Sequence, residues 1–137
     1  MARLEHALLC HSAISNADGT QSILGAGING VAVAEPLPAP LQITVVLQVA
    51  WGENELAQGH RLGIGVRTQA GDRLADIRSL VVPLRGSNTH PGAIRSAGVL
   101  PLPFVVEDFG EHLVEVRVDD EILASMSLWL LPAAGAG

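Results

Sequence analysis

The chain has 137 residues, the length of one domain that buries roughly 70% of its unfolded surface in a single core. Hydrophobic residues make up 48% of the chain and charged residues only 16%, with 15 glycines and 8 prolines, a composition that excludes a disordered protein and favours a turn-rich, all-β one. The net charge of −6, with eight arginines scattered along the sequence and no lysine, argues against a nucleic-acid binder.

The first thirty residues predict two strands and a bend. Residues 4–14 read as a strand, the Asp18-Gly19 pair is a strong turn signal, and residues 20–24 return antiparallel. Residues 25–30 match the dinucleotide-binding pattern G-x-G-x-x-G, but β-prone residues and three prolines follow where that motif needs a helix. We therefore interpret these glycines as a bulge or a tight bend.

The central part of the sequence predicts three more strands. Residues 41–51 show the clearest apolar alternation, with Trp51 on the buried side. An acidic loop leads to a strand over 61–67, and a turn leads to another over 74–82. Gly63 and Gly65 share one strand face, where they indicate either a neighbouring element lying over them or the close approach of another chain.

Prolines mark the next predicted strand as unusual. Residues 85–96 show no periodicity and predict a loop. The strand over 99–106 carries Pro101 and Pro103, whose missing N–H groups fall on the same side of the pleat. This predicts an edge or bulged strand, because a central strand needs hydrogen bonds on both flanks.

The C-terminal residues predict a hairpin. Apolar residues alternate over 114–118 and again over 122–128. Pairing Val118 with Ile122, and continuing to Val114 with Met126, keeps the apolar residues on one face and implies a turn of odd length. Such a turn needs a residue with positive φ, and Asp120 is the predicted one.

The same hairpin predicts a contact surface. If it buries Val114, Val116, Ile122, Met126 and Leu128, four apolar residues face the other way. They are Leu113, Leu123, Trp129 and Leu131. A tryptophan exposed among leucines indicates a possible interface. The alternative is that a loop or the N-terminal strand covers them.

Several short motifs carry a resemblance to known proteins. They are Ala7-Leu8-Leu9-Cys10, Ile23-Leu24-Gly25, the proline-rich loop before Leu41, and Phe109-Gly110-Glu111 leading into residues 116–119. With these features the chain resembles an uncharacterised family of small bacterial and phage-associated proteins. The resemblance implies an Ig-like β-sandwich and supplies no catalytic residues. The chain departs from the family at Asp120, where glycine is usual, and at the two prolines of the 99–106 strand.

No pattern for catalysis or metal binding stands out. His6, Cys10 and His11 lack the spacing of a zinc site, and no G-x-S-x-G elbow is present. We therefore predict no enzyme activity, no metal and no cofactor. A deep pocket lined by His60, His112 and an acidic residue would favour an enzyme or a small-ligand binder instead.

The sequence thus predicts an all-β, antiparallel β-sandwich, Ig-like, of about seven to nine strands, with one domain over 1–131 and a frayed tail over 132–137. The predicted function is a non-catalytic protein-interaction module that forms homo-oligomers. The alternative is a structural or decoration component of a phage particle or another large assembly. The start of the chain lacks a signal-peptide pattern and no apolar run spans a membrane, so the expected location is the cytoplasm, or the phage virion in the alternative.

Overall fold

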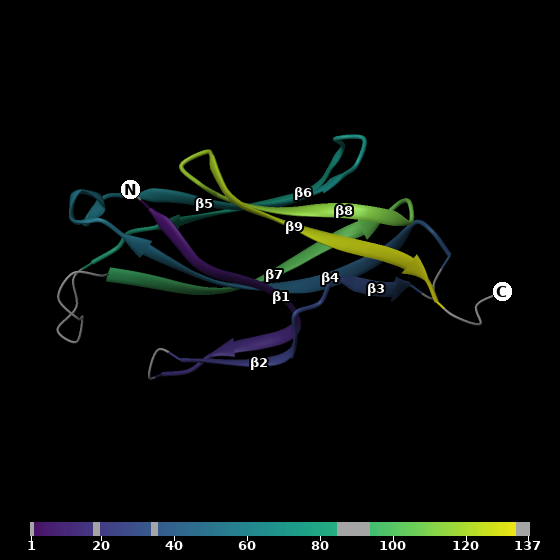
Figure 1. Ribbon diagram of the computed structural model, residues 1–137, viewed down its shortest axis with the longest axis horizontal. Coiled ribbons are helices and arrows are strands. Elements are labelled where there is room, and N and C mark those ends of the chain that lie inside the picture. The colour runs from purple at the N-terminus through teal and green to yellow at the C-terminus, as the bar shows by residue number, and fades with distance from the viewer. Residues whose placement is uncertain (1, 18–19, 34–35, 85–93, 134–137) are drawn as a thin grey trace.

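A computed structural model describes residues 2–17, 20–33, 36–84 and 94–133 of the chain (Figure 1). The described residues form nine strands and one short 3-10 turn, which is the upper end of the predicted number. The elements are β1 (Arg3–Ser15), β2 (Gln21–Ala26), β3 (Gly30–Val33), β4 (Ala39–Trp51), η1 (Glu53–Glu55), β5 (His60–Thr68), β6 (Arg73–Val81), β7 (Ile94–Val106), β8 (Gly110–Val118) and β9 (Glu121–Pro132).

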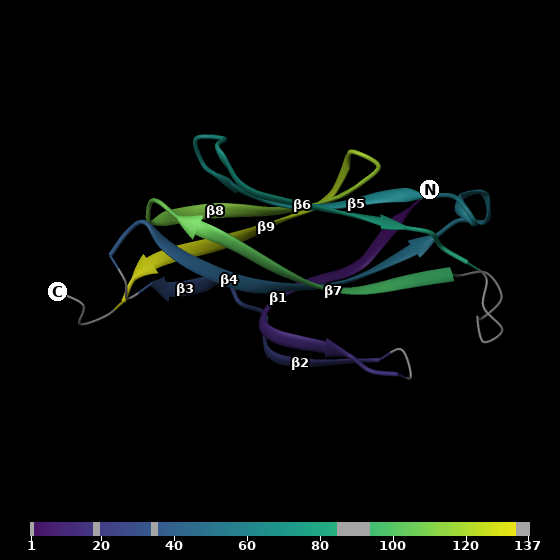
Figure 2. The ribbon, with the colours of Figure 1, turned by 180° about the vertical axis from the view of Figure 1, so that it is seen from behind.

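The strands form two sheets packed face to face, as Figure 1 and the reverse view in Figure 2 show. One sheet has the order β2-β1-β4-β7 and the other β3-β9-β8-β5-β6. Neighbouring strands run antiparallel except β3, which runs parallel to β9. The predicted antiparallel sandwich is confirmed, and the β3–β9 pair is its one departure among the described strands.

The strand order is that of an immunoglobulin-like sandwich. In that fold, strands A, B and E share one sheet and strands C, F and G the other. Here β1, β4 and β7 correspond to strands A, B and E, and β5, β8 and β9 correspond to strands C, F and G. The single cysteine, Cys10, is free, so apolar packing rather than an inter-sheet disulfide holds the layers together.

Alternation along the strands builds that apolar packing. Side chains of period-2 strands point to opposite faces, so every second residue enters the space between the sheets. The four-stranded sheet contributes Leu9, Ile43, Val45, Leu47, Val49, Leu102 and Phe104, and the five-stranded sheet contributes Leu62, Ile64, Val66, Val114, Val116, Leu128 and Leu130. The predicted alternation over 41–51 is confirmed as β4, whose neighbours in the sheet are β1 and β7.

Strand β7 lies at the edge of its sheet, as its prolines predict. It pairs with β4 along all thirteen residues, with Pro101 opposite Thr44 and Pro103 opposite Gln42. No other strand of the described residues pairs with it. The missing proline N–H groups therefore remove no hydrogen bonds from a second flank.

The glycine-rich segment after β2 carries the chain from one sheet to the other. Gly25 has a φ of 68° and Gly27 a φ of 80°, in the left-handed region that favours glycine. A Cβ on Gly25 would clash with the ring of His11 unless that side chain shifted. The bend predicted from the sequence is confirmed, and the next described element is the strand β3 rather than the helix that a dinucleotide motif needs.

Strand β9 continues through Pro132, which pairs with Val33, one residue beyond the predicted domain end at 131. Residues 134–137 of the predicted tail lie outside the described residues. The same holds for most of the predicted loop over 85–96, of which Ile94 to Ser96 belong to β7. Within the described ranges, no helix is long and apolar enough to cross a membrane.

Candidate interaction surfaces

Three of the four predicted contact residues lie on the outer face of the five-stranded sheet. Leu113, Trp129 and Leu131, which we call the Trp129 strip, point away from the buried side chains of β8 and β9. Trp129 is 45% exposed and Leu131 47% exposed, while Leu113 is partly buried. Trp129 lies opposite Glu111 on β8 and Gly30 on β3. The strip is therefore a half-open apolar surface.

Leu123, the fourth predicted contact residue, lies on the opposite face, and that part of the prediction is wrong. Val114 pairs with Met126 and Val116 with Ala124 as predicted, but then the register shifts at a β-bulge. Arg117 pairs with Ile122, which leaves Leu123 as the extra residue, packed against the core. Ile122, predicted to be buried, is 51% exposed.

The bulge also corrects the predicted turn. Val118 pairs with Glu121, so the turn holds two residues, Asp119 and Asp120, rather than an odd number. Asp119 has a φ of 50° and Asp120 a φ of 69°. Positive φ at both central residues is the type I′ geometry that matches the twist of a hairpin. The prediction of positive φ at Asp120 is confirmed.

A second apolar surface lies on the other sheet, where the sequence did not predict one. Strand β1 pairs with β4 only from Arg3 to Cys10, and beyond that point with β2 alone. We call residues 11–15 together with β2 the β1–β2 arm. In Figures 1 and 2 the arm lies outside the two layers, on the side of the four-stranded sheet that faces away from the other sheet. It contacts β7 through a hydrogen bond from the Gln21 side chain to the carbonyl of Gly98, 3.2 Å long.

The arm exposes large apolar side chains. Strand β2 contains no buried residue. Ile14 is 61% exposed and Leu24 is 71% exposed. Ser12 pairs with Leu24 and Ile14 with Ser22, so these two large side chains are diagonal neighbours on one face. The only sequence signal for this exposure was the adjacent Ile23 and Leu24, which break the alternation of a half-buried strand.

Five arginines that are scattered in the sequence gather on the outer face of the five-stranded sheet, among acidic residues. The pairs are Arg61 with Asp120, Arg67 and Arg117 with Glu115, and Arg73 and Arg78 with Asp76. Glu115 is only 4% exposed although it lies on an outer face. It stands opposite Gly65, while Arg117 stands opposite Gly63. The two glycines thus lie beside a network of neighbouring charged side chains.

His60 forms two short hydrogen bonds at the turn end of the β8–β9 hairpin. Its Nδ1 lies 2.7 Å from Oδ2 of Asp119, and its Nε2 lies 2.8 Å from the carbonyl oxygen of Glu55. Both partners are acceptors, so both ring nitrogens donate only in the protonated imidazolium. The hydrogen bond to Asp119 raises the pKa of His60, and the same contact lowers the pKa of the Asp119 carboxyl. The amide of Arg61 also donates to Oδ1 of Asp119, at 2.9 Å.

The two core histidines do not converge on one site. His112 pairs with Thr68 at the far end of β5 from His60, and both histidines are buried. The Nδ1 of His112 lies 3.1 Å from the carbonyl oxygen of Gly110. Within the described ranges, no group of three histidine, cysteine or acidic side chains is placed to hold a metal. The pocket that would favour an enzyme is therefore not formed by these two histidines.

The strand order in the two sheets places the chain in the class of immunoglobulin-like β-sandwich proteins. More specifically, the chain belongs to a family of unknown function, DUF6941, whose model matches residues 5–130. Among solved structures, it is similar to an immunoglobulin-like protein from Pseudomonas aeruginosa, with 18% sequence identity and a TM-score of 0.41, over 95% of this chain and 96% of that chain. No curated protein matches the sequence.

Proposed function

We propose that this chain is a non-catalytic interaction module that forms a homodimer through the β1–β2 arm. The observation that carries the proposal is the exposure of the arm. Strand β2 buries none of its side chains, and the large apolar side chains of Ile14 and Leu24 face solvent. An isolated two-stranded hairpin is marginally stable in water, and exposed apolar groups of this kind are typical of interfaces. A partner surface would cover both side chains.

The chemistry of the arm favours a second copy of the same chain as that partner. Between His11 and Gly30 the sequence contains one charged residue, Asp18, although the whole chain carries a net charge of −6. Two arms can therefore approach with little of the like-charge repulsion that the rest of the surface would cause. Contact between identical surfaces is also the usual arrangement in dimers with twofold symmetry.

The backbone of the arm offers a way to make the contact. Strand β2 is the edge of the four-stranded sheet, and its outer flank is paired with no other described strand. Two β2 strands related by a twofold axis would run antiparallel and exchange backbone hydrogen bonds. Such pairing would join the two four-stranded sheets and place Leu24 near its symmetry mate. The proposed module has no catalytic activity and binds neither nucleic acid nor a membrane. Its proposed location is the cytoplasm.

Sedimentation of the isolated protein tests the proposal. We expect the native chain to be a dimer at micromolar concentration and the Leu24→Asp variant to be a monomer with an unchanged circular dichroism spectrum. Burying an unpaired carboxylate on each chain should weaken association by at least about 100-fold. Ile122→Asp is the matched control, because Ile122 is also an exposed large apolar residue but lies outside the arm. It should remain a dimer.

A native chain that sediments as a monomer would overturn the homodimer. The Trp129→Asp variant separates the two apolar surfaces. If it alone yields monomers, the contact lies at the Trp129 strip and not at the arm.

A second candidate function is a structural or decoration component of a phage particle or another large assembly. The specific observation in its favour is that the arm and the Trp129 strip lie on different sheets, so one chain could be held on two sides. A chain that is monomeric alone and gains order only on a particle would support this candidate over the first.

A further inference from the structure

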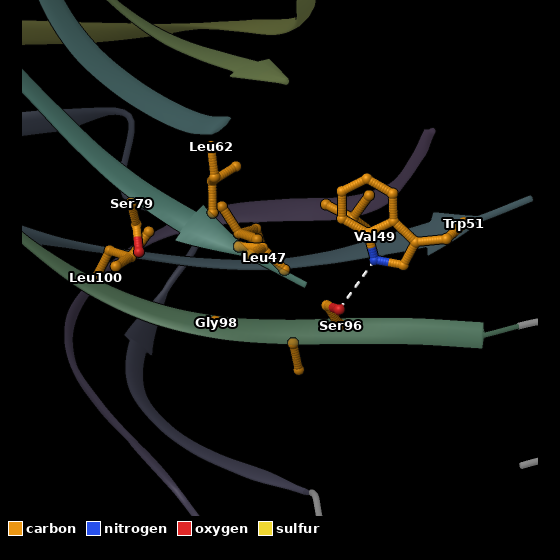
Figure 3. Close-up of a pocket in the computed structure, with 10 residues that line it drawn as sticks. Leu47, Val49, Trp51, Leu62, Ser79, Ser96, Gly98 and Leu100 are labelled. Carbon is orange, nitrogen blue, oxygen red and sulfur yellow. Dashed lines mark hydrogen bonds between the residues drawn. The ribbon is translucent and has the colours of Figure 1, made fainter. Parts of the chain in front are cut away.

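A cavity of about 160 Å³ lies between the two sheets on the side where β6 and β7 form their edges (Figure 3). Its walls are mainly apolar and include the side chains of Leu47, Trp51, Leu62 and Leu100. Protein cores rarely leave voids much larger than a water molecule, because the lining atoms lose packing contacts. A space of this volume therefore needs a specific cause in the sequence.

The cause is a set of small residues on the inward faces of the two edge strands, where Ser79 is exposed and Ser96 and Gly98 are half-buried, so the cavity opens to solvent on this side. Ser79 on β6 stands opposite Leu62, while Ser96 and Gly98 on β7 stand opposite Val49 and Leu47. Further along β7 the same face carries the large, buried side chains of Leu102 and Phe104 instead.

Gly98 is not required by the backbone. It does not have the positive φ found at the glycines of the turns. A Cβ at this position would lie 3.6 Å from the nearest atom of Leu47, which is ordinary van der Waals contact. The chain could therefore accept a side chain here, yet the space stays open.

The polar groups in the cavity define the chemistry that it could hold. The indole N–H of Trp51 donates to the hydroxyl oxygen of Ser96 at 2.9 Å, so the buried nitrogen is satisfied (Figure 3). The hydroxyl hydrogen of Ser96 remains to be donated to another acceptor. None of the described residues that line the cavity carries a charge.

We propose that this cavity is a binding site for a small, uncharged, largely apolar molecule with one hydrogen-bond acceptor. An enclosed apolar cavity of about 150 Å³ takes up benzene, so the space of about 160 Å³ here has the right size for a substituted benzene ring. The apolar walls would hold the ring, and the Ser96 hydroxyl would donate to the acceptor. A charged ligand would lose its hydration without gaining a partner. This site is independent of the proposed dimer.

Nuclear magnetic resonance tests the site with anisole, an uncharged ring with one ether oxygen, and with benzoate as the charged comparison. We expect anisole to shift the methyl signals of Leu47, Leu62 and Leu100 in a saturable way, with a Kd on the order of 1 mM. Benzoate should leave them unchanged. If anisole fails to shift them up to its solubility limit, or if benzoate shifts them equally, the proposal is wrong.

A cavity-filling variant provides the decisive comparison. Gly98→Val should fold, melt at a higher temperature than the native chain, and bind anisole at least 10-fold more weakly. Gly30→Val is the matched control, because Gly30 is also a strand glycine whose added Cβ would make ordinary contacts, 3.6 Å from Trp129. It should bind anisole as the native chain does. Unchanged binding by Gly98→Val would overturn the assignment of the cavity.

Discussion

The β8–β9 hairpin and the β1–β2 arm are both antiparallel hairpins, but they are stabilised differently. The β8–β9 hairpin has a paired strand on each side, β5 and β3, and one face buried against the opposite sheet. In the arm, β2 pairs with β1 and with no other described strand, and none of its residues is buried. The two hairpins show that strand pairing by itself does not determine burial. The first hairpin is covered within its own chain, whereas the second leaves apolar surface exposed.

The largest expected effect comes from the same truncation made in each hairpin. Leu128 in β9 is fully buried and Leu24 in β2 is 71% exposed. Leu128→Ala should lower the free energy of unfolding by about 2 to 5 kcal/mol, because it removes apolar contacts and leaves a cavity. Leu24→Ala should change it by less than about 0.5 kcal/mol.

Urea denaturation at a protein concentration that keeps the chain monomeric measures both values. A comparable loss in the two variants would mean that the arm is packed within its own chain, and the contrast between the hairpins would disappear.

A smaller, pH-dependent effect is expected at the turn that fixes β8–β9 to β5. The pKa of His60 is raised by Asp119, so its contribution to stability is complete below about pH 6.5 and is lost as the pH rises through the raised value. The pKa of Asp119 is lowered, so its contribution is present above about pH 4 and is lost as the pH falls through the lowered value. The pair therefore stabilises the fold most between about pH 4 and 6.5.

The Asp119→Asn variant isolates this contribution. The difference in unfolding free energy between the native chain and the variant should be larger at pH 5.5 than at pH 8.5. Asp120→Asn is the control, because the Asp120 carboxylate pairs with Arg61 and not with a histidine. Equal differences at both pH values for Asp119→Asn would show that the imidazolium is not what the carboxylate stabilises.

Much of the sandwich could be predicted because the alternation of apolar and polar residues indicates which face of a strand is buried. The alternation of β4 and the prolines of β7 indicated a buried strand and an edge strand, and both are confirmed. The alternation could not predict that Ile122 is exposed and Leu123 packs against the core. A bulge adds one residue to a strand without a signal in the alternation. The predicted odd turn length was wrong for the same reason.

The surfaces were harder to predict than the fold because they depend on which distant strands meet. The gathering of five arginines around Glu115, Asp76 and Asp120 follows from the β6-β5-β8 order, which no local pattern specifies. The cavity was missed because Ser79, Ser96 and Gly98 lie on two strands, and their coincidence appears only when the sheets pack. The exposure of the arm requires knowing that β1 leaves β4 after Cys10.

The smallest expected effect compares two residues of one turn. Asp119 and Asp120 both have positive φ, at which glycine is unstrained, but they differ in what their side chains do. The Asp119 carboxylate accepts hydrogen bonds from His60 and from the Arg61 amide, whereas Asp120 forms one exposed ion pair with Arg61. Exposed pairs of this kind contribute little to stability.

Asp120→Gly should therefore raise the free energy of unfolding by about 0.5 kcal/mol, since relief at the backbone exceeds the loss of the pair. Asp119→Gly relieves the same backbone conformation but removes both hydrogen bonds, so it should lower the melting temperature. Thermal unfolding of the two variants at pH 5.5 measures the contrast. A lower melting temperature for Asp120→Gly would mean that the pair with Arg61 stabilises the turn more than glycine relaxes it.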